Sequence, residues 1–145
     1  MTNARSAWTV WAAMFASLAL YVWLPTLLPP RAAPWRADQT AVAAFVVAIF
    51  ATAAGVATFA IRESLALRPL RSGGLDLSTA EGRARIRNAL LVTWLLCDLI
   101  GVFGLVLAIA SSRPGLAVPY AIAAAVFFVI HHPHPRYFEA SRATA

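Results

Sequence analysis

The stretch from Asn88 to Ala110, NALLVTWLLCDLIGVFGLVLAIA, decides the fold of this chain. Its one charged side chain is Asp98, and a helix of about 20 apolar residues is long enough to cross a bilayer. Three more apolar stretches lie before and after it in the sequence, at residues 7–28, 40–61 and 114–130. The four stretches predict an all-α fold, a four-helix transmembrane bundle that forms one membrane domain over residues 1–145.

The composition supports a lipid environment. Hydrophobic residues make up 61% of the chain and charged residues 12%, whereas roughly a quarter of the residues of a soluble domain are charged. A soluble fold of 145 residues has too much surface to bury so many apolar side chains. The net charge of +6 would suggest nucleic acid as a partner of a soluble protein. Here the arginines lie between the apolar runs, so we interpret them as topology anchors and expect no nucleic-acid binding.

Two of the connections between the apolar stretches are short. Residues 29–39 contain three prolines, which prevent the first helix from continuing into the second. Residues 111–113 form so short a connection that the third and fourth helices should make a tight antiparallel hairpin.

The second connection, residues 62–87, is the long one. Pro69 is expected to stop the second helix, and the glycines at 73–74 should break the chain. Ser78 and Glu81 then match a capping box, in which the two side chains satisfy exposed amides at a helix start. The third helix should therefore begin near Ser78 and enter the membrane near residue 88.

The arginines predict the orientation of the chain, because positively charged loops face the cytoplasm. Nine arginines fall on one side of the four predicted spans: Arg5, Arg62, Arg68, Arg71, Arg83, Arg85, Arg87, Arg136 and Arg142. Three fall on the other: Arg31, Arg36 and Arg113. This count places both termini and the long loop in the cytoplasm, as an even number of spans requires, and predicts a multi-pass protein of the inner (cytoplasmic) membrane.

Asp98 is the candidate functional residue. It lies near the middle of its span, where an aspartate costs roughly 3 kcal/mol to insert, and no arginine, lysine or histidine lies within a predicted span to pair with it. We therefore expect the neutral acid to be favoured, which suits a residue that binds and releases a proton. The structural alternative is a protonated residue that only holds helices together through a hydrogen bond to Thr93, Thr52 or Thr58.

Small residues recur on the second and third predicted helices. Ala51 and Gly55 belong to such a stripe on the second helix, and Gly101 and Gly104 to one on the third. Small side chains let helix backbones approach closely in lipid. We therefore predict a helix-packing role for these four residues.

Residues 40–110 resemble a known hairpin. Residues 79–87, TAEGRARIR, and 98–108, DLIGVFGLVLA, are similar to the basic loop and the carboxylate-containing segment of the proteolipid subunit c of F-type ATP synthases. The alternation of small residues from Ala51 to Ala57 is similar to the glycine motif of that family, with Gly55 as its remaining glycine. The resemblance implies that Asp98 binds the transported proton. The first and fourth helices and the longer loop lie outside the family's pattern.

Three histidines, His131, His132 and His134, follow the fourth predicted helix. A histidine tract can bind a metal, but His131 and His132 are adjacent, and the prolines that alternate with the histidines restrict the backbone. We expect these residues to lie at the membrane interface and expect neither a metal nor another cofactor.

Two functions remain open from the sequence. In the first, the chain is a proteolipid-like protein that binds or relays protons through Asp98, alone or in an oligomer. In the second, it is a non-transporting accessory subunit of a larger membrane complex. Both imply the lipid bilayer and other membrane subunits, or further copies of this chain, as partners. An enzyme is disfavoured because no convergent set of polar residues occurs within the spans.

Overall fold

The computed structural model describes residues 4–29 and 35–134, and the secondary structure within these residues is entirely helical. The elements are α1 (Ala4–Leu27), α2 (Ala37–Arg62), the π-helix η1 (Glu63–Leu67), α3 (Arg68–Arg71), α4 (Ala80–Ser111), the 3-10 helix η2 (Pro114–Leu116) and α5 (Ala117–Ile130). The predicted all-α fold is confirmed for this part of the chain. Some residues used in the predictions lie outside it: Pro30, Arg31, Pro34, Arg136 and Arg142.

Three helical stretches are long and apolar enough to cross a membrane. They are Arg5–Leu27, Ala37–Arg71 and Ala80–Ser111, whereas Pro114–Ile130 is a shorter apolar helix. These lengths indicate a membrane protein. Three of its helices are long enough to span the membrane, and the fourth is shorter.

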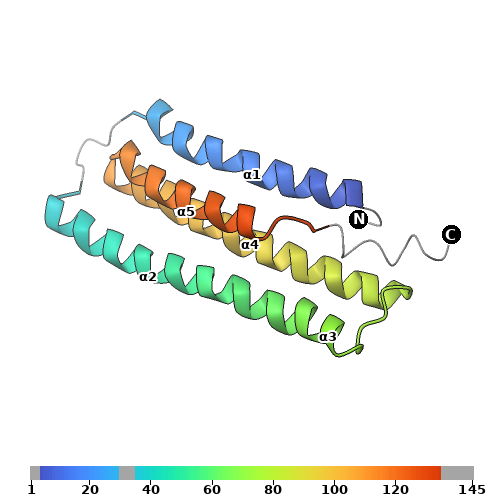
Figure 1. Ribbon diagram of the computed structural model, residues 1–145. Helices are drawn as coiled ribbons and strands as arrows, with labels where there is room; N and C mark the ends of the chain where they lie inside the picture. The colour runs from blue at the N-terminus through green and yellow to red at the C-terminus, as the bar shows by residue number, and fades with distance from the viewer. Residues whose placement is uncertain (1–3, 30–34, 135–145) are drawn as a thin grey trace.

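Helix α4 is the centre of the bundle, since α1, α2 and α5 all pack against it. In Figure 1, α1 begins at the end of the bundle where α3 lies and α4 starts, and α5 runs back toward that end and stops short of it. The end of α1, the start of α2 and the turn between α4 and α5 lie at the opposite end (Figure 1). The arginine count predicts that the end with α3 and the start of α4 faces the cytoplasm, and this stays a prediction.

The second helix does not stop at Pro69, as the sequence suggested, but runs on without interruption to Arg71. A proline lacks an amide hydrogen, and its ring clashes with the carbonyl group four residues earlier. The π-helix η1 ends two residues before Pro69, on a hydrogen bond from the amide of Arg68 to the carbonyl of Glu63, five residues back. This wider turn accommodates the proline. The helix ends at Arg71 with Ser72 as its C-cap, and Gly73 follows with a φ of +68°.

The start of α4 lies one residue later than the predicted capping box. The N-cap is Thr79, whose hydroxyl accepts a hydrogen bond from the amide of Gly82 at 3.0 Å. Asp76 supports the preceding turn by accepting from the amide of Ser78 at 2.8 Å. Hydrogen bonds from the side chain and backbone of Ser78 hold the pKa of Asp76 below its usual value. The assignment of Ser78 as the cap was therefore wrong, because Thr79 has the extended backbone of an N-cap and its hydroxyl bonds the third amide of the helix.

The predicted hairpin of the third and fourth helices is present. Ser112 caps α4 in the left-handed conformation, with φ of 55°, and the amide of Arg113 donates to the carbonyl of Ala108 at 3.0 Å. This is a common way to end a helix, because it satisfies carbonyls that have lost their helical partners. The chain then turns directly into η2 and α5, so α5 packs back along α4.

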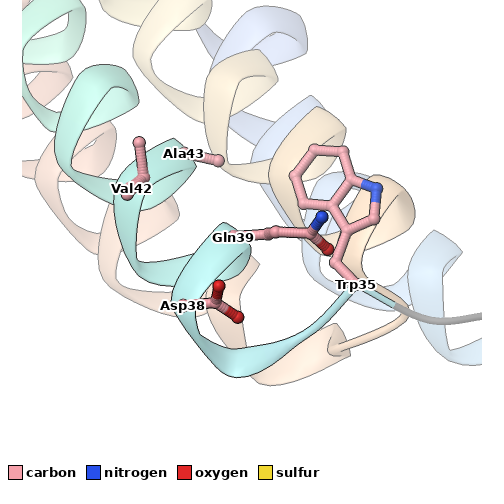
Figure 2. Close-up of a pocket in the computed structure, with 5 residues that line it drawn as sticks. All are labelled: Trp35, Asp38, Gln39, Val42 and Ala43. Carbon is pink, nitrogen blue, oxygen red and sulfur yellow. The ribbon is translucent and has the colours of Figure 1, made fainter.

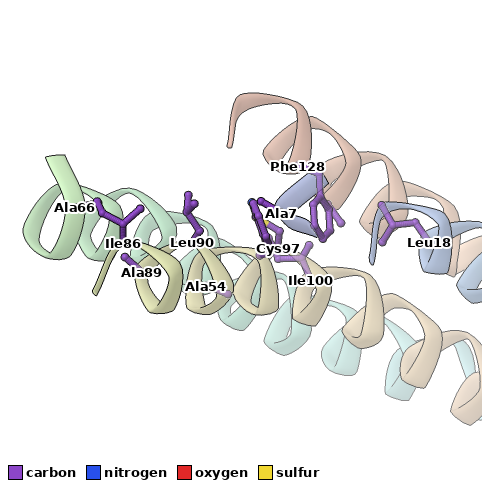
Figure 3. Packing of buried hydrophobic residues seen from close by; sticks show 12 residues of the cluster. Ala7, Leu18, Ala54, Ala66, Ile86, Ala89, Leu90, Cys97, Ile100 and Phe128 are labelled. Carbon is purple, nitrogen blue, oxygen red and sulfur yellow. The ribbon is translucent and has the colours of Figure 1, made fainter. Parts of the chain in front are cut away.

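The interior of the bundle is apolar and partly built from small residues. Figure 3 shows Ala66, Ile86 and Ala89 grouped at one end of the cluster, with Leu18 at the other. The outside is apolar as well: Val42, Phe45 and Val56 on α2 are 65%, 69% and 65% exposed. Such a surface would be unusual in water, and it suits a protein whose helices face lipid.

Candidate functional site

Asp98 lies at the contact between α4 and α1, where two side chains of α1 meet its carboxyl group. The hydroxyl oxygen of Ser17 is 2.9 Å from Oδ1 of Asp98, and the hydroxyl of Tyr21 donates to Oδ2 at 2.9 Å. All three side chains are partly buried, and Asp98 makes no ion pair with any described residue. Asp98, Ser17 and Tyr21 are called the Asp98 cluster below.

Gly101, three residues after Asp98 on α4, makes room for this cluster. A Cβ atom added to Gly101 would lie 2.8 Å from Cδ2 of Leu18 and 2.9 Å from Cδ2 of Tyr21. Real Cβ atoms essentially never approach other atoms so closely, so a larger residue would displace the side chains of Leu18 and Tyr21. The glycine therefore allows the phenol to reach Asp98.

The hydroxyl group of Ser17 has two possible acceptors in the cluster. Oγ of Ser17 lies 2.6 Å from the carbonyl oxygen of Met14 as well as 2.9 Å from Oδ1 of Asp98, yet a hydroxyl has a single hydrogen. If Ser17 donates to Met14, the contact with Asp98 needs a hydrogen on the carboxyl group. A neutral Asp98 provides it, with Oδ1 donating to Ser17 and Oδ2 accepting from Tyr21. With a carboxylate, the single hydrogen of Ser17 is shared between the carbonyl of Met14 and Oδ1 of Asp98.

The threonines proposed from the sequence as partners of Asp98 are bonded elsewhere. Thr52, Thr58 and Thr93 each donate to a carbonyl three or four residues back in their own helix, at 2.8, 2.6 and 2.8 Å respectively. This local bond is available to any threonine within a helix. The assignment of these residues as partners was therefore wrong, and the partners come from α1.

Ser17 and Tyr21 could have been found in the sequence by their spacing. They are four residues apart in the middle of the first apolar stretch, so on a helix they lie on one face. Two hydroxyl groups on one face of an apolar helix can form hydrogen bonds with a lone carboxyl group on a neighbouring helix. The partners expected for Asp98 all belong to the second and third helices, so this hydroxyl face of the first helix was not predicted.

A second polar cluster lies where α5 ends. His131 is 1% exposed, with its Nε2 2.9 Å from Oγ1 of Thr58 and its Nδ1 2.8 Å from the Arg62 guanidinium. These three residues, called the His131 cluster below, join α5 to α2. His131 is thus buried within the bundle, and its location at the membrane interface stays a prediction. Arg62, placed in the second loop by the sequence, lies in α2.

The direction of these hydrogen bonds fixes the tautomer of His131. A guanidinium can only donate, so Nδ1 of His131 must be the acceptor for Arg62. Nε2 then carries the ring hydrogen and donates to Thr58, whose own hydroxyl donates to the carbonyl of Gly55 at 2.6 Å. His131 is consequently neutral, since a hydrogen on Nδ1 would remove the bond to Arg62 and bring two cations together.

Other helices supply donors to the carbonyl groups that end α5. Three side chains donate to them: Trp11 of α1 to Phe128 at 3.0 Å, Arg62 of α2 to Ile130 at 3.2 Å, and Trp94 of α4 to His131 at 2.9 Å. The last carbonyls of a helix have no partner within it, and an unpaired backbone group in lipid costs several kcal/mol. The three donors explain how α5 can end within the apolar bundle.

The position of Trp94 shows how deep this end lies. At about 1.5 Å per residue, Trp94 is roughly 21 Å along α4 from Ala80 and about 9 Å past residue 88, where the predicted span begins. Helix α5 therefore ends partway along α4, beside Trp94, and next to Arg62 at the end of α2.

The predicted helix-packing residues all lie against other helices. A Cβ added to Gly55 would lie 2.6 Å from Cζ of Phe127, and one added to Gly104 would lie 2.5 Å from Cβ of Tyr120. Both neighbours belong to α5. Ala51 is partly buried against the core. The glycines on α2 and α4 thus give space to large side chains of α5, and Gly101 gives it to side chains of α1.

The histidines are not arranged as a metal site. Both ring nitrogens of His131 are engaged by protein groups, and His132 uses its Nδ1 on the carbonyl of Val129 at 3.0 Å. His134 lies beside His132, with 6.0 Å between the ring centroids. Within residues 4–29 and 35–134, no group of three or more His, Cys, Asp or Glu side chains could hold a metal ion.

A hollow of about 450 Å³ lies at the start of α2, lined by Trp35, Asp38, Gln39, Val42 and Ala43. Figure 2 shows Gln39 reaching toward Trp35 from the first turn of the helix. The side chain of Gln39 accepts from the amide of Arg36 at 3.1 Å, and Asp38 lies 3.6 Å from the Arg36 guanidinium. These polar groups cap the helix, so the hollow is explained by the helix start.

Comparison of the chain with protein-family models, with curated proteins and with solved structures finds no match.

Proposed function

We propose that this chain is a proteolipid-like membrane protein in which Asp98 reversibly binds a proton. The observation that supports the proposal is the Asp98 cluster itself, a carboxyl group in the middle of an apolar helix whose partners are two hydroxyl groups of α1 and which makes no ion pair with any described residue. Carboxyl groups within membrane spans commonly belong to proton or ion sites. The resemblance of residues 98–108 to the subunit c segment assigns the same role to the same residue, although its hydroxyl partners come from α1, outside that hairpin.

Proton release would change the contact between α1 and α4. A charged Asp98 can keep its bond from Tyr21, but Ser17 can donate to it only by turning away from Met14. The charged form also loses roughly 3 kcal/mol to desolvation at the middle of a span. Water that reaches the cluster, or a movement of α1, has to offset this cost. Protonation of Asp98 and the closure of α1 on α4 are therefore linked in this proposal.

Reaction with dicyclohexylcarbodiimide tests the proposal, because this reagent modifies protonated carboxyl groups in lipid. We expect mass spectrometry of the reconstituted protein to locate the adduct on Asp98 at neutral pH. Asp98→Asn should abolish the labelling, and Asp38→Asn, which removes an exposed carboxyl group, should leave it unchanged. Infrared spectroscopy should show the carbonyl band of a protonated carboxyl group that disappears in Asp98→Asn only. Absence of that band in the native protein would refute the proposal.

The second candidate is an accessory subunit that transports nothing. It is favoured by the hydroxyls of α4 on either side of Asp98, because Thr93 and Ser111 both donate to carbonyls of α4 at 2.8 and 2.7 Å. Neither hydroxyl is turned toward the cluster as a proton relay would require. In this case Asp98 serves to hold α1 on α4.

Two measurements separate the candidates. The accessory role predicts that Asp98→Asn is silent in cells and that purification in mild detergent recovers fixed partner subunits. The proton-binding role predicts loss of function with the fold intact, and recovery of the chain alone or as copies of itself. Under both roles we place the protein in the inner (cytoplasmic) membrane with its termini in the cytoplasm.

A further inference from the structure

A groove of about 350 Å³ lies between η1 and the first turns of α4. Its walls include Glu81, Arg85, Asn88 and Val92, at spacings of four, three and four residues along one face of α4, and Leu65 of η1. The polar residues lie toward the start of α4, and the apolar Val92 lies further along the helix. The groove is therefore polar at the end near the loop and apolar at the end near the predicted span.

The apolar end of the groove continues into the lipid-facing surface. Leu65 is 39% exposed and Val92 is 38% exposed, so an apolar chain could lie against both without entering the core. The predicted span begins near Asn88, which places the groove at the level where α4 leaves the apolar layer. A molecule that fits both ends must have an apolar tail and a polar head at this level.

Some of the arginines near the groove have no ion-pair or hydrogen-bond partner among the described residues. Of the arginines in this region, Arg71 forms an ion pair with Glu63 at 3.0 Å, and Arg83 donates to carbonyls of its own loop. Within the described part of the chain, the guanidinium of Arg85 has no hydrogen-bond or ion-pair partner, and the same holds for Arg68 and Arg87. The groove therefore offers a guanidinium group that no described residue engages in an ion pair or hydrogen bond, with the carboxyl group of Glu81 one turn away on α4.

The segment around the groove carries an excess of arginine. It contains six arginines, Arg62, Arg68, Arg71, Arg83, Arg85 and Arg87, and three acidic residues, Glu63, Asp76 and Glu81. Basic pockets between membrane helices recognise acidic lipid headgroups. The excess of positive charge favours an anionic headgroup over a zwitterionic one.

We propose that this groove binds one anionic phospholipid. The phosphate lies against Arg85 and the amide of Asn88, and an acyl chain follows Leu65 and Val92 into the bilayer. Glu81, on the rim, opposes the negative headgroup and so limits the affinity. The ligand would join the second helix to α4 at the end of the bundle where no other helix covers η1.

Native mass spectrometry of the full chain tests this site with palmitoyl-oleoyl phosphatidylglycerol as the probe and phosphatidylcholine of the same acyl chains as the comparison. We expect one phosphatidylglycerol to be retained per chain, in preference to phosphatidylcholine. One arginine near the membrane surface changes the binding of an anionic lipid by about fivefold. Arg85→Gln should therefore weaken retention about fivefold, whereas Glu81→Gln should strengthen it.

Arg113→Gln is the matched control, since it removes the same charge at the opposite end of α4. It should leave phosphatidylglycerol retention unchanged. Equal retention in Arg85→Gln and Arg113→Gln, or equal retention of the two lipids by the native chain, would overturn the proposal. Asp98→Asn should not alter lipid retention, so this test is independent of the proton-binding role.

Discussion

Replacing Trp94 by phenylalanine tests how α5 ends inside the bundle. Trp94 is fully buried, with 0% exposure, and its indole donates to the carbonyl of His131 at 2.9 Å. Phenylalanine keeps an aromatic ring at the same place and removes the donor. The carbonyl of His131 is then buried without this partner, which costs about 1–3 kcal/mol.

The smaller ring also leaves unfilled space in the core, which adds to the loss. We therefore expect the free energy of unfolding to fall by about 2–4 kcal/mol, whereas a surface substitution changes it by roughly 0.5 kcal/mol at most. A difference of about 2 kcal/mol corresponds to roughly a 30-fold change in the unfolding equilibrium.

The measurement is reversible unfolding in mixed micelles by titration with sodium dodecyl sulfate. Trp23→Phe is the control, because Trp23 is 58% exposed and the change is chemically the same. Trp11→Phe removes a second donor, to Phe128, and should also destabilise the protein. If Trp94→Phe loses no more stability than Trp23→Phe, the pairing of the α5 carbonyls does not matter and the explanation of its short length fails.

Three further predictions concern the glycines and the long loop. Gly101→Ala should push Tyr21 away, lower the free energy of unfolding by about 1–3 kcal/mol and change the carbodiimide labelling of the Asp98 cluster. Gly82→Ala should open the loop before α4 to limited proteolysis, because its Cβ would collide with the backbone carbonyl of Asp76. The hydrogen bonds from Ser78 lower the pKa of Asp76, so the stability that they add is complete above the ordinary pKa of aspartate, near 3.9. This stability is lost as the pH falls through the lowered pKa. Proteolysis of the loop should rise over that pH range in the native protein and should not depend on pH in Asp76→Asn.

Gly115→Ala is the control for both glycine variants, since a Cβ at Gly115 would meet nothing within 4 Å. It should change neither stability nor cleavage. A comparable loss in Gly115→Ala would show that the effect comes from the loss of glycine alone and not from the contacts described for Gly101 and Gly82.

The helices were predictable from the sequence because each is a long apolar run bounded by breakers. The fourth helical stretch has the bounds expected for it, Pro114–Ile130, and the hairpin before it follows from its three-residue connection. Helix ends were harder to predict. Pro69 is a helix breaker by its local chemistry, but the π-helix η1 accommodates it, and nothing in the local sequence indicates a change of hydrogen-bond period.

The candidate site was only partly predictable for a different reason. Asp98 is conspicuous because it is the one charged residue of its apolar stretch. Its partners Ser17 and Tyr21 are distant in the chain, and the threonines considered in their place are bonded within their own helices. His131 gives no sign in the sequence of being buried, because its burial depends on where α5 stops relative to Trp94 and Arg62.

The pairing at the end of α5 has a consequence for the order in which the chain enters the membrane. The side chains that satisfy its carbonyls, Trp11, Arg62 and Trp94, all precede α5 in the sequence. A ribosome therefore releases every donor before it makes the segment that needs them. A circular permutant that begins with α5 would expose these carbonyls to the bilayer until the rest was synthesised, and we expect it to be degraded during biogenesis.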